Sequence, residues 1–238
     1  MTRNTVFITI VLVLVVAYSA TTLAINNYFE ISAGHNEGDF DTNVTTRLTR
    51  LNLSAGTLVN RHQFDINLSY LNVEDSTGAK DEGPGDVILH YGYTTTKFAN
   101  NLSLYSSLAT KLPTADDTKN LGTGETDYGV YFALNKHWQK TIASIGAGYL
   151  VFGEPPGTNY DNSKQYSLSV YQQLQRLNLG LYANYQTAYS ADIPNAAEAG
   201  MNIYYILTGH SGITLNLAKG LKRGSPDYNF QAGWLHWF

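Results

Sequence analysis

A period-two alternation of apolar and polar residues restricts the fold of this chain more than any other feature of its sequence. From Ile25 to the C-terminus, large apolar residues recur at every second position over long runs, as in residues 64–70, 128–134 and 177–182. Such alternation places successive side chains on opposite faces of an extended strand. The sequence therefore predicts β-strands that have one apolar and one polar face.

Twelve such runs follow one another along the chain. They cover residues 26–36, 43–57, 62–74, 86–96, 101–112, 126–137, 141–152, 163–174, 177–189, 199–208, 211–219 and 228–238. A strand that crosses a bilayer at an angle needs about 9–11 residues, whereas strands of soluble proteins average roughly 5–6. The length of the runs favours strands that span a membrane. In the second and seventh strands either parity fits, so their faces stay open.

The connections between these strands alternate between short and long. The short ones, at residues 58–61, 97–100, 137–140, 175–176 and 209–210, carry Arg61, Lys97, Lys140 and Arg176 but no acidic residue. The long ones include residues 75–85, 113–125, 153–162 and 190–198, and most acidic residues lie in or beside them. This alternation is typical of bacterial outer-membrane barrels, in which tight turns face the periplasm and long loops face the exterior.

The composition agrees with a sheet that has one face in lipid. Hydrophobic residues make up 43% of the chain, yet only 14% of it is charged, compared with about 25% in ordinary soluble proteins. The absence of cysteine excludes disulfides, thiolate metal sites and cysteine nucleophiles. A net charge of −4 gives no support to nucleic-acid binding.

The first 24 residues have the organisation of a signal peptide. Arg3 gives a short positive region, residues 6–18 form an apolar run that only Thr9 interrupts, and small residues lead to Ala24. We therefore expect residues 1–24 to be removed on export and residues 25–238 to form one mature domain. The alternative is an uncleaved anchor, since residues 6–24 approach the ~20 residues that span a bilayer.

The last strand alternates up to an aromatic C-terminal residue. Phe230, Trp234 and Phe238 share one parity, and this pattern resembles the C-terminal strand by which the barrel-assembly machinery recognises outer-membrane proteins. His236 departs from the usual hydrophobic choice. The alternative is an ordinary final strand of a soluble sheet.

A sheet that spans a membrane has to close on itself, because unpaired backbone groups are costly in hydrocarbon. We therefore predict an all-β fold, a closed antiparallel transmembrane β-barrel of about twelve strands. Barrels of about eight strands are filled by their own side chains and those of about 16–18 hold an open channel, so we expect a narrow lumen, partly constricted by tyrosines. The candidate lumen residues are Asp65, His90, Tyr105, Lys111, Asp127, Tyr131, Tyr171, Tyr182, Asn184 and Tyr204.

One segment carries a motif, K-L-P-T-A-D at residues 111–116 followed by L-G-T-G-E-T-D at residues 121–127. It resembles the K-L-P-T-G-D … G-[ST]-G-x-x-D segment of a proteobacterial outer-membrane β-barrel family of unknown function, which is related to proposed transporters of the phenol-degradation (meta-pathway) group. Ala115 stands where that family has glycine. The resemblance implies an outer-membrane location and transport, and it carries no catalytic residues.

The same motif has a direct structural interpretation. If the flanking strands form a hairpin, Lys111 faces Asp127 across the ladder on the lumen side, near the mouth. An opposite-charge pair of this kind contributes roughly 0.2–1 kcal/mol. We expect the pair to hold the intervening loop at the entrance.

These features predict a passive outer-membrane channel of a Gram-negative bacterium for a small solute, and the tyrosines favour a neutral or aromatic one. The expected partners are outer-membrane lipid and lipopolysaccharide, the barrel-assembly machinery and the solute, and no cofactor, metal or nucleic acid is expected. One alternative is a closed barrel with a structural or surface-interaction role. Another is a lipid-modifying hydrolase, for which His210 and Ser211 are the tempting pair and His90, with Asp65 and Ser69 near it, is a second place to look. The acidic loop residues Asp116, Asp117, Glu125 and Asp127 could also bind Ca²⁺.

Overall fold

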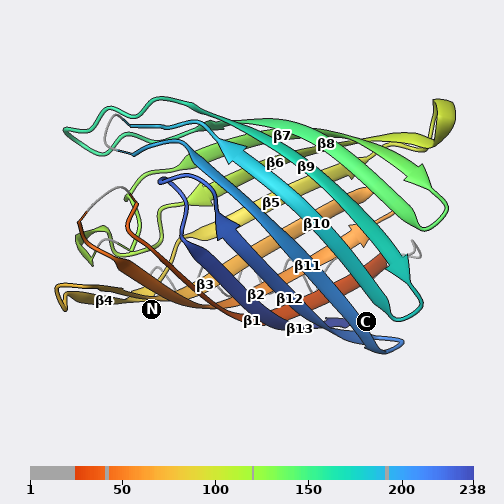
Figure 1. Cartoon of the computed structure of the whole chain (residues 1–238), viewed down its shortest axis with the longest axis horizontal. Coiled ribbons are helices and arrows are strands. Elements are labelled where there is room, and N and C mark those ends of the chain that lie inside the picture. The colour runs from red at the N-terminus through yellow and green to blue at the C-terminus, as the bar shows by residue number, and fades with distance from the viewer. Residues whose placement is uncertain (1–24, 41–42, 120, 191–192) are drawn as a thin grey trace, which may run out of the picture.

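The computed structural model describes residues 25–40, 43–119, 121–190 and 193–238. They form a closed antiparallel barrel whose strands run obliquely to its long axis (Figure 1). The predicted signal peptide, residues 1–24, lies outside the described residues. No helix in the described part of the chain is long and apolar enough to cross a membrane.

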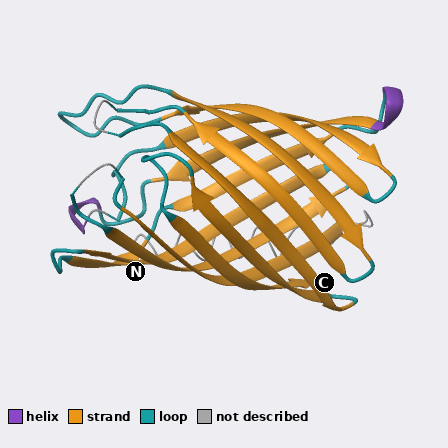
Figure 2. Cartoon of the chain, in the orientation of Figure 1, coloured by secondary structure: helices purple, strands orange, loops and turns teal. Residues whose placement is uncertain are grey.

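Almost all of the described chain is strand, and the two short 3₁₀ helices lie in connections (Figure 2). The strands are β1 (Ile25–Gly38), β2 (Thr46–Val59), β3 (His62–Asp75), β4 (Lys80–Pro84), β5 (Val87–Thr94), β6 (Leu102–Leu112), β7 (Asp127–Trp138), β8 (Thr141–Val151), β9 (Ser163–Leu174), β10 (Leu177–Gln186), β11 (Ala196–Thr208), β12 (Ser211–Gly220) and β13 (Tyr228–Trp237).

The wall of the barrel consists of twelve of these strands, all except β4. Each wall strand pairs antiparallel with the next, β5 pairs with β3, and β1 pairs with both β2 and β13. The ring of pairings is therefore complete, which satisfies the backbone groups that an open sheet would leave at its edges. The predicted fold class and strand number are confirmed.

Strand β4 is a feature that the sequence prediction missed. Residues 75–85 were expected to form a long loop, but β4 pairs there with the outer part of β3, from Tyr70 to Glu74. The tight turn that allows this pairing is closed by Asp75, whose Oδ1 accepts hydrogen bonds from the backbone N–H groups of Thr77 and Ala79 at 2.8 and 3.1 Å. The glycines, Pro84 and charged residues of this segment suggested a loop, whereas the length of β3 provides a template for pairing.

The short connections lie at the opposite end of the barrel from the long loops, together with the C-terminus (Figure 1). The strand registers leave two-residue loops at Asn60–Arg61, Gln139–Lys140, Gln175–Arg176 and Gly209–His210. Two of these loops are shorter than predicted, because β2 and β7 continue further. The connection predicted at residues 97–100 is instead longer, since β5 ends at Thr94 and β6 begins at Leu102.

The barrel has an apolar exterior in place of an apolar core. Leu181, Ile145 and Leu168 are 64%, 62% and 58% exposed on the outer face. Of the residues that the structure describes, the buried hydrophobic ones are Val59, Leu121 and Ala133. A water-soluble protein buries such side chains, so this wall is suited to a hydrocarbon environment.

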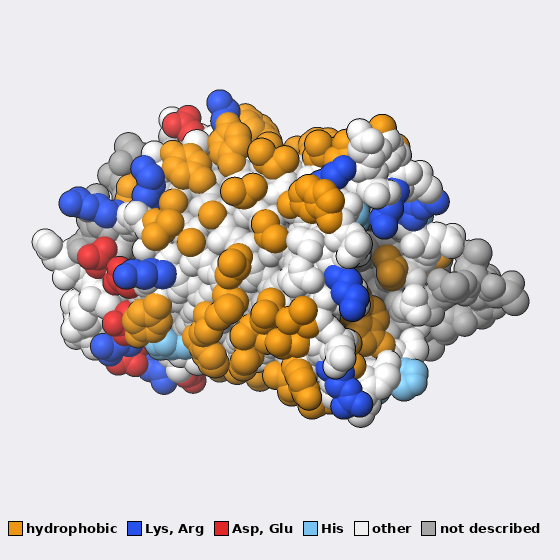
Figure 3. Space-filling view, turned by 45° about the vertical axis from the view of Figure 1, so that its right-hand side comes forward, with side chains coloured by type: hydrophobic (Ala, Val, Ile, Leu, Met, Phe, Trp, Pro, Cys, Tyr) orange, Lys and Arg blue, Asp and Glu red, His pale blue; other side chains and the backbone are white. Residues whose placement is uncertain are grey.

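Hydrophobic side chains spread over the outer wall, and the acidic side chains in that view gather at the end with the long loops (Figure 3). The register also settles the two strands whose faces the sequence left open. On β2, Leu51 and Leu53 point outward and are 54% and 43% exposed. On β8, which is the seventh predicted strand, Ile145 points outward and is 62% exposed.

Candidate functional site

All of the predicted lumen residues lie on wall strands and have the parity that faces the interior. Side-chain contacts across strands fix this orientation for most of them, Tyr171 and Tyr204 line cavities, and exposed apolar residues alternate with them on the outer face. The structure divides the predicted lumen residues into three groups. One group forms a polar network, another lines two cavities, and the third lies at the mouth. These residues are Asp65, His90, Tyr105, Lys111, Asp127, Tyr131, Tyr171, Tyr182, Asn184 and Tyr204.

Most of the lumen tyrosines lie flat along the wall. Each ring covers a glycine of a neighbouring strand, and a Cβ atom placed on that glycine would come within 1.9–2.9 Å of the tyrosine. The six pairs, which we call wall pairs, are Tyr28–Gly56, Tyr105–Gly92, Tyr131–Gly146, Tyr171–Gly180, Tyr182–Gly200 and Tyr204–Gly212. These tyrosines lie on the inner face of the wall, and in these pairs the rings lie against the wall instead of projecting across the lumen.

A network of polar side chains connects β1, β3, β5 and β6. Asp65 is its centre: Oδ1 accepts a hydrogen bond from the hydroxyl of Tyr28, and Oδ2 lies 2.9 Å from His90 Nδ1 and 2.8 Å from Gln63 Nε2. The other ring nitrogen of His90 lies 3.1 Å from the hydroxyl of Tyr105. The Asp65 side chain is only 8% exposed, so these contacts replace its hydration.

The network holds two of the wall pairs in place. Tyr28 covers Gly56 and Tyr105 covers Gly92, and the hydroxyl of each ring is tied to Asp65 or to His90. The sequence prediction placed Asp65 and His90 on the same face and also considered Ser69 beside them. The contacts of the network run through the two tyrosines instead, and Ser69 lies against Gly85.

The opposite side of the lumen is hollow. A cavity of about 700 Å³ is lined by side chains of β9 to β11 and β13, including Gln165, Asn184 and Glu198. A second cavity of about 370 Å³ is lined by Glu30, Asn178 and Tyr204 among others. Both cavities share four lining residues: Tyr171, Asn202, Asn216 and Gln231. The two cavities therefore adjoin, and together they form a hollow lined mainly by amides, hydroxyls and tyrosines.

The amide groups of this lining bind one another. Asn216 Nδ2 donates to Asn202 Oδ1 at 2.6 Å and to the hydroxyl of Tyr182 at 3.0 Å. Asn184 Nδ2 donates to Glu198 Oε1 at 3.1 Å. Such side chains offer both donors and acceptors to a solute.

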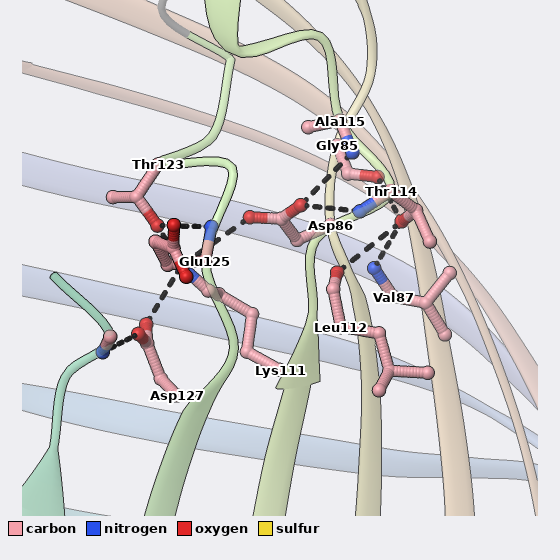
Figure 4. A network of polar contacts seen from close by, with 11 residues as sticks. Gly85, Asp86, Val87, Lys111, Leu112, Thr114, Ala115, Thr123, Glu125 and Asp127 are labelled. Carbon is pink, nitrogen blue, oxygen red and sulfur yellow. Dashed lines mark hydrogen bonds and ion pairs between the residues drawn. The ribbon is translucent and has the colours of Figure 1, made fainter. Parts of the chain in front are cut away.

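The predicted ion pair at the mouth is present. Lys111 Nζ lies 2.7 Å from Asp127 Oδ2 and 3.5 Å from Asp86 Oδ2, and it donates to the hydroxyl of Thr123 at 2.8 Å (Figure 4). Lys111 and Asp127 are also direct register partners on β6 and β7. Thr123 belongs to the connection between β6 and β7, so Lys111 ties that connection to both carboxylates.

The two carboxylates extend this network to further connections (Figure 4). Asp86 accepts hydrogen bonds from the backbone N–H groups of Thr114 and Ala115, each at 3.0 Å. Asp127 accepts one from the N–H of Gly153, in the connection after β8, at 3.0 Å. The motif at residues 111–127 thus joins three connections at the mouth, which is more than the single loop that the sequence suggested.

An aromatic cluster lies beside this network at the same end. The ring of Tyr189 packs against Phe152 and Tyr160, with centroid distances of 4.5 and 5.5 Å. Burial raises the pKa of the Tyr189 phenol, and the nearby Tyr160 and Asp127 raise it further. This cluster fixes the connections after β8 and β10 to each other.

Sequence analysis missed several charged lumen residues. Arg50 on β2, Glu30 on β1 and Glu198 on β11 face the interior, the last two as lining of the cavities. Their parity relative to Asn52, Ser32 and Asn202 was the signal that could have identified them. A single charged residue on a polar face does not interrupt the apolar–polar alternation, so the pattern does not single it out.

The alternative chemistries find no geometric support in the described residues. Ser211 Oγ lies 2.8 Å from Thr208 Oγ1, within the two-residue turn that contains His210, and no contact joins Ser211 to that histidine. Among the described residues, no group of three or more histidine and acidic residues is placed to hold a metal ion. The considered calcium ligands Asp116 and Asp127 are separately engaged, with Thr118 and with Lys111.

The predicted insertion residues form part of the outer surface near the C-terminus. Phe230, Trp234 and Phe238 are 44%, 39% and 64% exposed. His236, the exception in the pattern, stacks on Phe238 with a centroid distance of 6.2 Å. The aromatic row is therefore continuous despite the histidine.

The barrel resembles solved structures of outer-membrane channels. An outer membrane channel from Pseudomonas putida F1 matches with a TM-score of 0.73 and 14% identity over 92% of this chain and 97% of that one. The chain has the fold of an outer-membrane channel. The NanC porin matches with a TM-score of 0.64 and 14% identity (87% and 98% covered), and the KdgM porin in complex with disordered oligogalacturonate matches with 0.56 and 9% identity (88% and 99%).

No protein-family model matches the sequence, and no curated protein resembles it. The family suggested by the K-L-P-T-A-D motif is therefore not supported by a sequence match. At 14% identity or less, the structural likeness shows the fold alone. The barrel fold is confirmed, and the class of solute depends on the groups that line the lumen.

Proposed function

We propose that this chain is a passive channel of a Gram-negative outer membrane and that it passes a small solute. The observation that carries the proposal is the hollow of two adjoining cavities inside a barrel whose outer wall is apolar. A barrel filled by its own side chains would have no such space. Selectivity in a passive channel comes from pore width and lining groups.

The orientation follows from the two ends of the barrel. The long loops, with most of the acidic residues, would face the exterior, and the two-residue turns and the C-terminus would face the periplasm. Export would use residues 1–24 as a signal peptide. Insertion by the barrel-assembly machinery would use Phe230, Trp234 and Phe238, and the outer wall would contact lipid and lipopolysaccharide.

The charges of the lumen limit the class of solute. Among the described strand residues, Arg50 and Lys111 are the arginine and lysine that face the interior, and Lys111 is neutralised by Asp127. A polyanion such as an oligogalacturonate would need a series of basic side chains, which this wall does not offer. The amides, hydroxyls and tyrosines of the cavities instead suit a small solute of low charge.

The test is a planar-bilayer recording of the purified, detergent-refolded protein, together with a liposome-swelling assay. We expect stepwise single-channel currents and faster swelling with small neutral solutes than with a polyanionic oligosaccharide. Folding of the same sample is checked by heat-modifiable gel migration. A folded barrel that gives neither current steps nor solute flux would contradict the channel and favour the closed structural barrel.

A further inference from the structure

Arg50 is a lumen-facing cation whose hydrogen-bonding capacity is largely unused. It lies on β2 with the inward parity of Asn52 and Ser54, both of which bond to lumen side chains. Its Nε is buried without a hydrogen-bond partner, and its guanidinium forms no ion pair with any described residue. A guanidinium carries five N–H donors in a fork that matches a carboxylate, so an unpaired one favours an anionic ligand.

The side chain of Arg50 extends over β1 toward β13, whose inner residues line the larger cavity. It lies across Gly34 of β1, where a Cβ atom would come within 3.2 Å of Nε and 3.5 Å of Cγ of the arginine. The register partner of Gly34 on β13 is Gln231, which lines both cavities. The missing side chain of Gly34 therefore allows the arginine to extend from β2 over β1 to the edge of the hollow.

A second unsatisfied group lies at the same edge. Asn229 lines the larger cavity beside Gln231, and its Oδ1 is buried without a partner. Unpaired buried polar atoms are rare in folded proteins. The β13 side of the cavity therefore carries two amide side chains, Asn229 and Gln231, that a polar ligand group can contact.

The lining of the same cavity also carries a carboxylate. Glu198 on β11 lines the cavity, and it forms no ion pair with Arg50 within 4.0 Å. A solute with an anionic group near Arg50 must therefore present a neutral or positive end toward Glu198. A second negative charge at the far end would be repelled.

We propose that Arg50 receives the carboxylate of a small monocarboxylate solute, with Asn229 and Gln231 beside it and the body of the solute against the tyrosines of the cavity. The proposal rests on the proposed channel function and names its substrate class. Tyr131, Tyr171 and Tyr182 line the same cavity and offer ring surface to an aromatic body. Arg50, the arginine that faces the interior among the described strand residues, explains how a lumen unsuited to polyanions can still select one negative charge.

The test uses three probes of similar shape: benzoate, its neutral analogue benzyl alcohol, and terephthalate, which has a second carboxylate at the far end. Binding is measured by titration of the folded full barrel in detergent micelles and by concentration-dependent block of single-channel current. We expect wild-type protein to bind benzoate more tightly than either other probe. R50Q should weaken benzoate binding about tenfold, as expected for a lost charge-assisted contact, and leave benzyl alcohol unchanged.

Two further variants sharpen the result. R47Q is the matched control, since Arg47 lies on the same strand but pairs with Glu37 at 2.7 Å and is largely exposed, so it should bind benzoate like the wild type. E198Q should strengthen binding of terephthalate more than that of benzoate. Equal benzoate affinity in R50Q and wild type, or an equal loss of benzyl alcohol binding, would overturn the proposal.

The two measurements separate this inference from the channel function. Current steps and neutral-solute flux without Arg50-dependent benzoate binding would reject the monocarboxylate site and leave the channel intact. Arg50-dependent binding in micelles without any current would reject the channel and support the site.

Discussion

The ring of Tyr171 on β9 lies directly over Gly180, its register partner on β10. A Cβ atom on Gly180 would come within 2.4 Å of Tyr171 Cε1. The ring is 40% exposed and lines both cavities. The width of the hollow therefore depends on the absence of a side chain at one position of the neighbouring strand.

Substitution of Gly180 by alanine should narrow the lumen. The added methyl group has to displace the Tyr171 ring toward the cavity, and such overpacking costs roughly 1–3 kcal/mol. We expect a lower single-channel conductance and a lower urea midpoint of unfolding. The matched control is G209A, because a Cβ on Gly209 meets no atom within 4 Å. Equal conductance in G180A and wild type would contradict the role of the wall pairs.

Replacement of Lys111 by methionine should loosen the mouth. Asp127 and Asp86, whose side chains are 18% and 9% exposed, would lose their cation, and an unpaired, mostly buried group costs about 1–3 kcal/mol. We expect reduced thermal stability in detergent and noisier open-channel current. K80M serves as control, since Lys80 and Glu82 are 50% and 53% exposed and such pairs contribute ~0–1 kcal/mol. Similar effects of K111M and K80M would contradict the proposal that Lys111 holds the connections at the mouth together.

Removal of His90 should destabilise the other side of the lumen. The largely buried carboxylate of Asp65 loses one partner and Tyr105 loses its anchor, so H90A should lower the free energy of unfolding by about 1–3 kcal/mol. Urea unfolding followed by tryptophan fluorescence measures the loss. H35A, which removes a solvent-exposed contact with Thr49, should change it little. An unchanged free energy of unfolding in H90A would mean that the network adds nothing to stability.

The aromatic cluster at the mouth should weaken at alkaline pH. The pKa of Tyr189 is raised in the folded protein, first by burial and then by Tyr160 and Asp127, so the folded state holds this proton more tightly than the unfolded state. The resulting stabilisation is complete below the ordinary tyrosine pKa and is lost as the pH rises through the raised value. An absorbance titration should show one fewer late-ionising tyrosine in Y189F than in the wild type. An unchanged titration curve in Y189F would contradict the assignment.

Much of the fold could be predicted because a barrel wall is a local pattern repeated many times. Alternation at residues 64–70 sets the faces of β3 without reference to any other strand, and the turns at Gln175–Arg176 and Gly209–His210 are apparent from the breaks in that pattern. Strand β4 could not be predicted in this way. Its pairing depends on how far β3 extends beyond the wall, and its own composition is that of a loop.

Strand parity grouped the inward-facing residues, but it did not predict which of them contact one another. Parity placed Asp65 and His90 on one interior face, and the hairpin placed Lys111 opposite Asp127. The wall pairs and the contact of Asp86 with Lys111 depend on which strands become neighbours and in which register. Arg50 gained its significance only when Gly34 and Gln231 proved to lie beside it.

On most strands the sequence by itself determined which side chains face lipid and which face the interior, because that choice is made residue by residue in an extended chain. It also determined that the sheet must close, because an open edge is too costly in hydrocarbon. Only the tertiary structure decided which tyrosine lies over which glycine, where the lumen is hollow, and which charge remains unpaired. Those properties depend on the stagger between strands, and a shift of one residue in register would change every one of them.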